Sequence, residues 1–177
     1  MTGALASRAS KQGGTAVAAA PISLPEALPE LPISPYTNYV TARGMAQLQA
    51  RLADAGSRLE QLPAEAILER DYLGRHMRWL RARIESAVPV GLRLVGRDAV
   101  AFGATVQVRD AEGRVSDYRI VGEDEADAER NLLSWVSPMA RAMQGAQVGD
   151  TVRWHRADDD CSLQVLAIDF SDPLSAR

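Results

Sequence analysis

The stretch Ser137-Pro138-Met139-Ala140-Arg141-Ala142-Met143-Gln144-Gly145 contains the start and the end of one short helix. Ser137 is a typical N-cap, because its hydroxyl can accept a hydrogen bond from an unpaired backbone N–H group. Pro138 suits the first helical position, and Gly145 can adopt the left-handed conformation that ends a helix. Val148-Gly149-Asp150 then indicates a turn. The pattern predicts a short helix between two strands.

The sequence around this helix alternates with the period of two that is typical of strands. We expect strands over residues 104–109, 115–121, 132–136, 151–154 and 163–168. Residues 110–113 and 158–160 supply turns between neighbouring strands. Residues 89–170 are therefore predicted to form a small twisted antiparallel sheet, packed by the short helix, followed by a tail over residues 171–177.

The N-terminal half has apolar residues spaced three and four apart, as on one face of a helix. A first set comprises Met45, Leu48, Leu52, Ala55, Leu59 and Leu62. A second set comprises Ala66, Leu73, Met77, Leu80, Ile84 and Ala87, interrupted by Arg70. Pro63 separates the two sets and disfavours helix at the residue before it. We predict an antiparallel helical hairpin within residues 36–88, with arms over 41–60 and 64–86, and hence an α+β fold.

Residues 1–35 are rich in alanine and proline, which predicts a disordered or polyproline-like tail. A short docking peptide within residues 24–33 is the alternative. The apolar run of residues 16–20 is too short for a signal-peptide core, and no stretch is long enough to cross a bilayer. We therefore expect a cytoplasmic protein.

Charge and cysteine content exclude several classes of function. The chain has 20 basic and 23 acidic residues and a net charge of −3, which argues against a protein that works by neutralising nucleic-acid phosphates. Cys161 is the only cysteine, so an intramolecular disulfide and a Cys-rich metal site are excluded. His76 and His155 are expected on the surface, and the acidic run of residues 123–127 is expected to be a solvated loop. No cofactor and no bound metal are predicted, and a protein partner is favoured.

Four blocks, in order, resemble the bacterial Gre transcript-cleavage factors. They are residues 38–44, 102–106, 118–127 and the Ser137-Pro138 block with its Val-Gly-Asp turn, and the resemblance covers residues 36–170. It implies an FKBP-like fold for the C-terminal domain. It also implies a monomeric factor that docks on the rim of the RNA polymerase secondary channel and inserts its hairpin there. The polymerase-binding residues expected from the resemblance are Trp135, Ser137, Pro138, Met139 and Arg141.

The hairpin tip departs from the family. Gre factors carry an Asp-x-Ser-Glu-Asn-Ala-(Glu/Asp)-Tyr motif there, which helps to hold a second Mg²⁺ ion in the polymerase active site. Residues 59–72 contain no such motif. Aligning Glu69-Arg70-Asp71-Tyr72 with it is possible, but we prefer the alignment that matches residues 78–85 to the end of the family's second helix. At about 1.5 Å per residue, each arm is roughly 30 Å long, shorter than in the family.

We therefore expect a factor that regulates elongation without stimulating cleavage and is not itself an enzyme. The alternative is an active cleavage factor that uses Glu65, Glu69 or Asp71 at the tip. A prolyl isomerase is a third hypothesis from another class, but fold alone confers no activity and the sequence shows no pattern of an aromatic-lined pocket. The second arm is basic, which fits either a solvated helix face or a face that meets acidic polymerase surface or nascent RNA. Its arginines are Arg70, Arg75, Arg78, Arg81 and Arg83.

Overall fold

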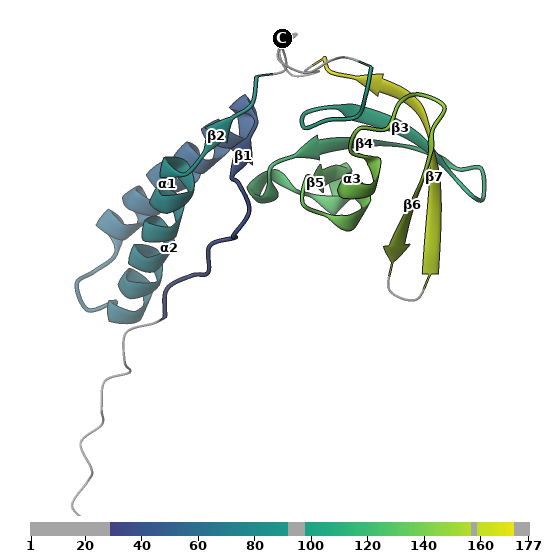
Figure 1. The fold of residues 1–177 in the computed structure, drawn as a ribbon. Helices are drawn as coiled ribbons and strands as arrows, with labels where there is room; N and C mark the ends of the chain where they lie inside the picture. Colours follow the sequence, from purple (N-terminus) through teal and green to yellow (C-terminus); the bar gives the residue numbers. More distant parts are fainter. Residues whose placement is uncertain (1–28, 92–97, 157–158, 172–177) are drawn as a thin grey trace, which may run out of the picture.

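A computed structural model describes residues 29–91, 98–156 and 159–171. The chain forms a helical hairpin beside a β domain (Figure 1). Helix α1 (Ala42–Gln61) and helix α2 (Ile67–Glu85) make the hairpin, and the short strands β1 (Tyr39–Val40) and β2 (Val88–Pro89) pair in parallel at its base. The predicted hairpin followed by a β domain is confirmed.

The predicted apolar seam holds the hairpin together. Leu48 and Ala55 of α1 are buried, as are Leu73 and Leu80 of α2. Thr41 caps α1, because its hydroxyl accepts a hydrogen bond from the Gly44 backbone N–H at 3.0 Å. Helix α2 begins at Ile67, later than expected, because residues 63–66 form a turn closed by a hydrogen bond from the Ala66 N–H to the Pro63 carbonyl.

Arg70 interrupts the apolar seam because its side chain forms hydrogen bonds with the end of the other helix, α1. Its guanidinium donates hydrogen bonds to the Leu59 carbonyl at 3.1 Å and to the Leu62 carbonyl at 2.9 Å. The last carbonyls of a helix have no partner within the helix, so this contact satisfies two acceptors at the end of α1. Arg70 is therefore part of the hairpin turn, and our expectation of a solvated or partner-facing side chain is wrong for this residue.

The β domain is a five-stranded sheet with strand order β5-β4-β3-β7-β6. Its strands are β3 (Thr105–Asp110), β4 (Val115–Val121), β5 (Leu132–Ser134), β6 (Thr151–Arg156) and β7 (Asp159–Asp169). Three of the four pairings are antiparallel, as predicted, whereas β5 runs parallel to β4. The reason is the connection between them, which crosses back through two 3-10 turns, η1 (Glu123–Glu125) and η2 (Ala128–Arg130), instead of a hairpin turn.

Helix α3 (Pro138–Met143) is the predicted short helix and packs on this sheet. Its Ala140 and Met143 are almost fully buried, against strand residues such as Val106, Ile120 and Val165. In the ranges that the structure describes, no helix is long and apolar enough to cross a membrane.

The end of the predicted tail lies against the hairpin. Residues 1–28 are outside the described part of the chain, but residues 29–35 run alongside α2 as an extended segment (Figure 1). Arg75, Arg78 and Trp79 of α2 donate hydrogen bonds to this segment. The part of the tail that the structure describes thus has defined partners.

Candidate functional site

The start of α3 has the geometry that the sequence predicts. The Ser137 hydroxyl accepts a hydrogen bond from the Ala140 N–H at 3.2 Å, and Pro138 occupies the first turn, where it is exposed. Arg141 is also exposed and lies three residues further along, on the same side of the helix as Pro138. Pro138 and Arg141 therefore present a common face to a partner.

Met139 does not belong to this exposed face. Only 9% of its surface is accessible, and it joins the core of the β domain. A one-turn helix must bury part of its circumference to stay folded, and here Met139, Ala140 and Met143 make up the buried side. Met139 is therefore not at the exposed start of the helix, as we expected, and its contact with a partner stays an untested prediction.

Trp135 lies in an aromatic cluster that the sequence did not predict. Its ring is 5.0 Å from that of Tyr39 and 6.3 Å from that of Tyr36, both in edge contact. Tyr39 also contacts Phe102 at 5.8 Å, and the Arg141 guanidinium lies 4.7 Å from the centre of the Tyr36 ring. The cluster joins residues before the hairpin to residues of the β domain. The signal in the sequence was that Tyr39 and Phe102 fall within two of the Gre-like blocks.

This cluster forms a pocket beside α3. Tyr39, Phe102 and Trp135 supply aromatic walls, and Arg141 and Gln144 complete the lining. The Trp135 indole N–H is buried without a hydrogen-bond acceptor. An aromatic wall beside an exposed arginine suits a protein partner that brings an apolar side chain and an oxygen acceptor. We define the docking surface as Trp135, Ser137, Pro138 and Arg141 with this pocket. Our expectation that the chain lacks an aromatic-lined pocket is wrong.

The hairpin tip is the second candidate site, and it is more apolar than acidic. Glu65 lies in the connecting loop and Glu69 in the first turn of α2, both exposed, while Asp71 is partly buried. Large apolar side chains surround these acids: Ile67, Leu68 and Tyr72 are 66%, 64% and 55% exposed. Among the described residues, no group of three or more His, Cys, Asp and Glu side chains could hold a metal ion.

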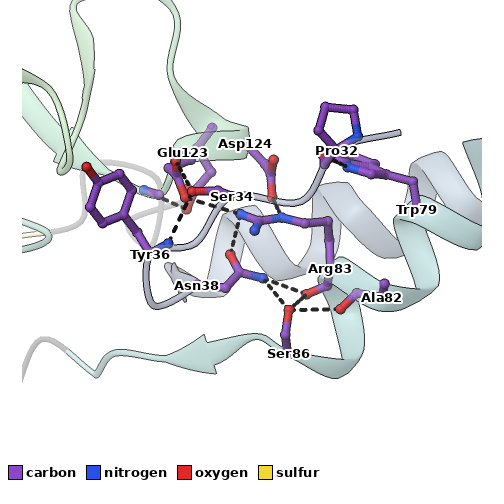
Figure 2. Close-up of polar contacts among 12 residues, drawn as sticks. Pro32, Ser34, Tyr36, Asn38, Trp79, Ala82, Arg83, Ser86, Glu123 and Asp124 are labelled. Atoms are coloured by element: carbon purple, nitrogen blue, oxygen red, sulfur yellow. Dashed lines mark hydrogen bonds and ion pairs between the residues drawn. The ribbon is translucent and has the colours of Figure 1, made fainter. Parts of the chain in front are cut away.

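The two candidate sites are held relative to each other by a buried junction centred on Arg83 (Figure 2). Arg83 is 2% exposed, and its guanidinium donates to Asp124 Oδ2 at 2.7 Å and to Asn38 Oδ1 at 2.7 Å. Glu123 Oε2 lies 3.7 Å from the same guanidinium. In return the Asn38 amide donates to the Arg83 carbonyl at 2.6 Å. The contacts with Asp124 and Glu123 connect α2 to η1, and those with Asn38 connect α2 to the residue before β1. The junction therefore links the hairpin to the β domain.

Glu125 makes a second set of links across the junction. Its carboxylate accepts from the Thr41 backbone N–H at 3.0 Å and from the Thr41 hydroxyl, as well as from the Gly122 N–H at 3.3 Å. The carboxylate comes so close to α1 that a Cβ atom on Gly44 would lie 2.2 Å from Glu125 Cδ. The acidic run is therefore not a solvated loop, as expected from its composition, but part of the buried contact between the domains.

His76, Arg75 and Arg78 of the second arm have structural partners too. His76 stacks on Trp79, with ring centres 6.0 Å apart, and partial burial together with the neighbouring Arg51 lowers its pKa. The hydrogen bond from Arg78 to Glu30 raises the pKa of that arginine. The arm thus presents fewer free cations than its sequence indicates.

The fold defines a class: a protein with a helical hairpin joined to a β domain that carries a short helix capped by Ser137 and begun by Pro138. Comparison with known proteins places the chain within this class. The family described as the C-terminal domain of the transcription elongation factors GreA and GreB matches residues 95–170. The transcription elongation factor GreB of Xanthomonas axonopodis pv. citri is 32% identical over 162 residues, which cover 79% of this chain and 95% of that protein. The chain belongs to the GreA/GreB family of transcription elongation factors.

Other relatives match over a smaller part. GreB of Neisseria meningitidis serogroup A is 36% identical over 99 residues, which cover 55% of this chain and 61% of that protein. The chain thus spans about three-fifths of the length of this relative. Among solved structures, the GreA factor homolog Gfh1 of Thermus thermophilus aligns over 76% of this chain and 99% of its own, with a TM-score of 0.38 and 19% identity.

Proposed function

We propose that this protein binds RNA polymerase through the docking surface of its β domain and places its hairpin in the secondary channel. There it regulates elongation without stimulating transcript cleavage. Membership of the GreA/GreB family supports the choice of partner. The observation that carries the site is the exposed Pro138 and Arg141 beside a pocket with aromatic walls.

The composition of the tip supports the absence of cleavage stimulation. A carboxylate oxygen must come within about 2.1 Å of Mg²⁺ to bind it, and Mg²⁺ is held by one or two such carboxylates. The exposed acids near the turn are Glu60 at the end of α1, Glu65 in the loop and Glu69 at the start of α2. They come from three different segments, and among the described residues no acidic group that could hold a metal ion is formed. With 20 and 19 residues, α1 and α2 are each about 30 Å long. In our proposal, the tip enters the channel but delivers no metal-binding acid to the catalytic centre.

Replacing Pro138 with aspartate is expected to weaken binding to core polymerase about tenfold, or about 1.4 kcal/mol. The exposed ring is lost from the centre of the docking surface, whereas aspartate is tolerated at the first turn of a helix, where its charge is favourable. Binding is measured by fluorescence anisotropy with labelled protein, and folding by the thermal melt followed by circular dichroism. As a control, Gln147→Asp alters an exposed residue beyond α3. Unchanged binding of the Pro138 variant would rule out this docking surface.

Added to stalled, backtracked complexes with Mg²⁺, the protein is expected not to raise the release of short 3′ RNA fragments above the intrinsic rate. The variant with Glu65→Ala, Glu69→Ala and Asp71→Ala serves as the comparison. If the wild-type protein stimulates cleavage and the triple variant does not, the active-factor alternative is correct and these acids form the true tip. Polymerase binding is measured in the same samples, so that failure to bind is distinguished from binding without cleavage.

A further inference from the structure

An extended segment of the chain occupies one face of α2 in the manner of a bound peptide. We call residues 29–34 the strap. Arg75 donates to the Pro29 carbonyl at 3.0 Å, and the Trp79 indole N–H donates to the Pro32 carbonyl at 3.1 Å. Between them, the Arg78 guanidinium donates to Glu30 Oε1 at 2.9 and 2.6 Å. Residues spaced three and four apart on a helix face the same way, so α2 presents three donors in a row to the strap.

The sequence of the strap suits this contact. Pro29 and Pro32 favour an extended, polyproline-like backbone, whose carbonyl oxygens are not used in internal hydrogen bonds. The carbonyls of these two prolines are the ones that Arg75 and Trp79 engage. Glu30 supplies the charge that matches Arg78. The face of α2 therefore recognises two features of the segment: free backbone acceptors at a fixed spacing and one carboxylate.

The contact is weak enough to be displaced. The side chains of Arg78 and Glu30 are 52% and 62% exposed, and ion pairs so open to water contribute little to stability. The two hydrogen bonds to carbonyls are exposed, so water competes for both groups and the net gain from each bond is small. Ile33 stays 52% exposed, so the strap buries little apolar surface.

The last residue of the strap and the chain that follows it are held more firmly. The Ser34 hydroxyl donates to Glu123 at 2.8 Å, and Asn38 is 5% exposed in the Arg83 junction (Figure 2). A weak ligand tethered this closely experiences an effective concentration in the millimolar range. The strap therefore occupies the face of α2 in the free protein, but an external peptide can compete with it for this face.

We propose that the α2 face formed by Arg75, Arg78 and Trp79 is a binding site for an extended, proline-containing acidic peptide, and that the strap occupies it as an internal competitor. A partner protein that carries such a segment gains the site only by displacing residues 29–32. Neither the strap nor these three residues are part of the docking surface, so the role can be tested on the free protein without polymerase.

The test uses the full-length chain, with the charge of the strap reversed by Glu30→Lys, and NMR spectra of the indole and arginine side-chain N–H groups. Trp79→Phe identifies the Trp79 indole signal. In the Glu30→Lys protein, this signal is expected to move away from its wild-type position as the strap leaves. Adding a synthetic peptide with the sequence of residues 29–34 should then return it toward that position. In the wild-type protein, the peptide concentration that gives half of the maximal change in the Trp79 signal should be at least fivefold higher.

Three controls define the outcome. Glu60→Lys makes the same charge change at an exposed acid of α1, the other helix, and should leave the Trp79 signal in place. The peptide with lysine in place of its glutamate should not bind. In the Glu30→Lys protein, a second substitution, Arg78→Ala, should abolish the change of the Trp79 signal on adding the original peptide. If the signal is unchanged by Glu30→Lys, or if both peptides act alike, the proposal is wrong. An equal response to a single-stranded RNA oligomer would contradict it by showing a site for polyanions.

Discussion

Replacing Arg83 with alanine is expected to lower the free energy of unfolding by about 3–5 kcal/mol, as found when one partner of a buried ion pair is removed. The guanidinium is the common partner of Asp124, Glu123 and Asn38. The side chains of Asp124 and Glu123 are only 12% and 20% exposed, so their charges would remain largely shielded from water with no cation beside them. The cost is therefore set by the desolvated acids left behind more than by the bonds that are lost.

The measurement is urea unfolding of the full chain, followed by circular dichroism at a helix wavelength and by tryptophan fluorescence. Because Arg83 joins the hairpin to the β domain, we expect the two probes to give separate transitions in the variant, with the hairpin unfolding first. Arg81→Ala, an exposed arginine of the same helix, should cost less than about 0.5 kcal/mol. Similar losses in the two variants would contradict a special role for Arg83.

Arg83 also illustrates what the sequence can and cannot predict. The hairpin and the strands follow from local periodicity, and Leu48, Ala55, Leu73 and Leu80 are buried as the spacing requires. The cap at Ser137 follows from the chemistry of a hydroxyl before a proline. These features depend on interactions between residues that are close in the sequence, so they can be predicted from one sequence alone.

The junction depends on residues far apart in the chain, and that is why composition misled us there. Arg83 looked like one of several cations on a basic arm, and residues 123–125 looked like a solvated acidic loop. Arg83 pairs with Glu123 and Asp124 across about forty residues, and Glu125 bonds to Thr41 from the other side of the chain. These long-range contacts bury Arg83 and Glu125 and partly bury Glu123 and Asp124. Met139 shows the same limit on a smaller scale: a one-turn helix has no periodicity from which to tell its buried side from its exposed side.

Replacing Gly44 with alanine is expected to destabilise the protein by about 2 kcal/mol or more, although helix propensity alone favours alanine by about 1 kcal/mol. The added Cβ would lie 2.2 Å from Glu125 Cδ and Oε1. Glu125 must then move away from the Thr41 N–H and hydroxyl, which leaves buried polar groups without partners at about 1–3 kcal/mol each. The close approach therefore outweighs the gain in propensity.

Gly56→Ala is the matched control in the same helix. There the nearest atom to the new Cβ would be Met77 Cε at 3.7 Å, an ordinary contact, so this variant should be stabilised by up to about 1 kcal/mol. Both are measured by urea unfolding, together with the double variant Gly44→Ala, Glu125→Ala. Removing the carboxylate removes the overlap, so the loss from Gly44→Ala should be much smaller in the Glu125→Ala background than in the wild-type one. If the two losses are equal, contact with Glu125 is not what requires glycine at position 44, and the junction must tolerate a wider separation of α1 from the β domain.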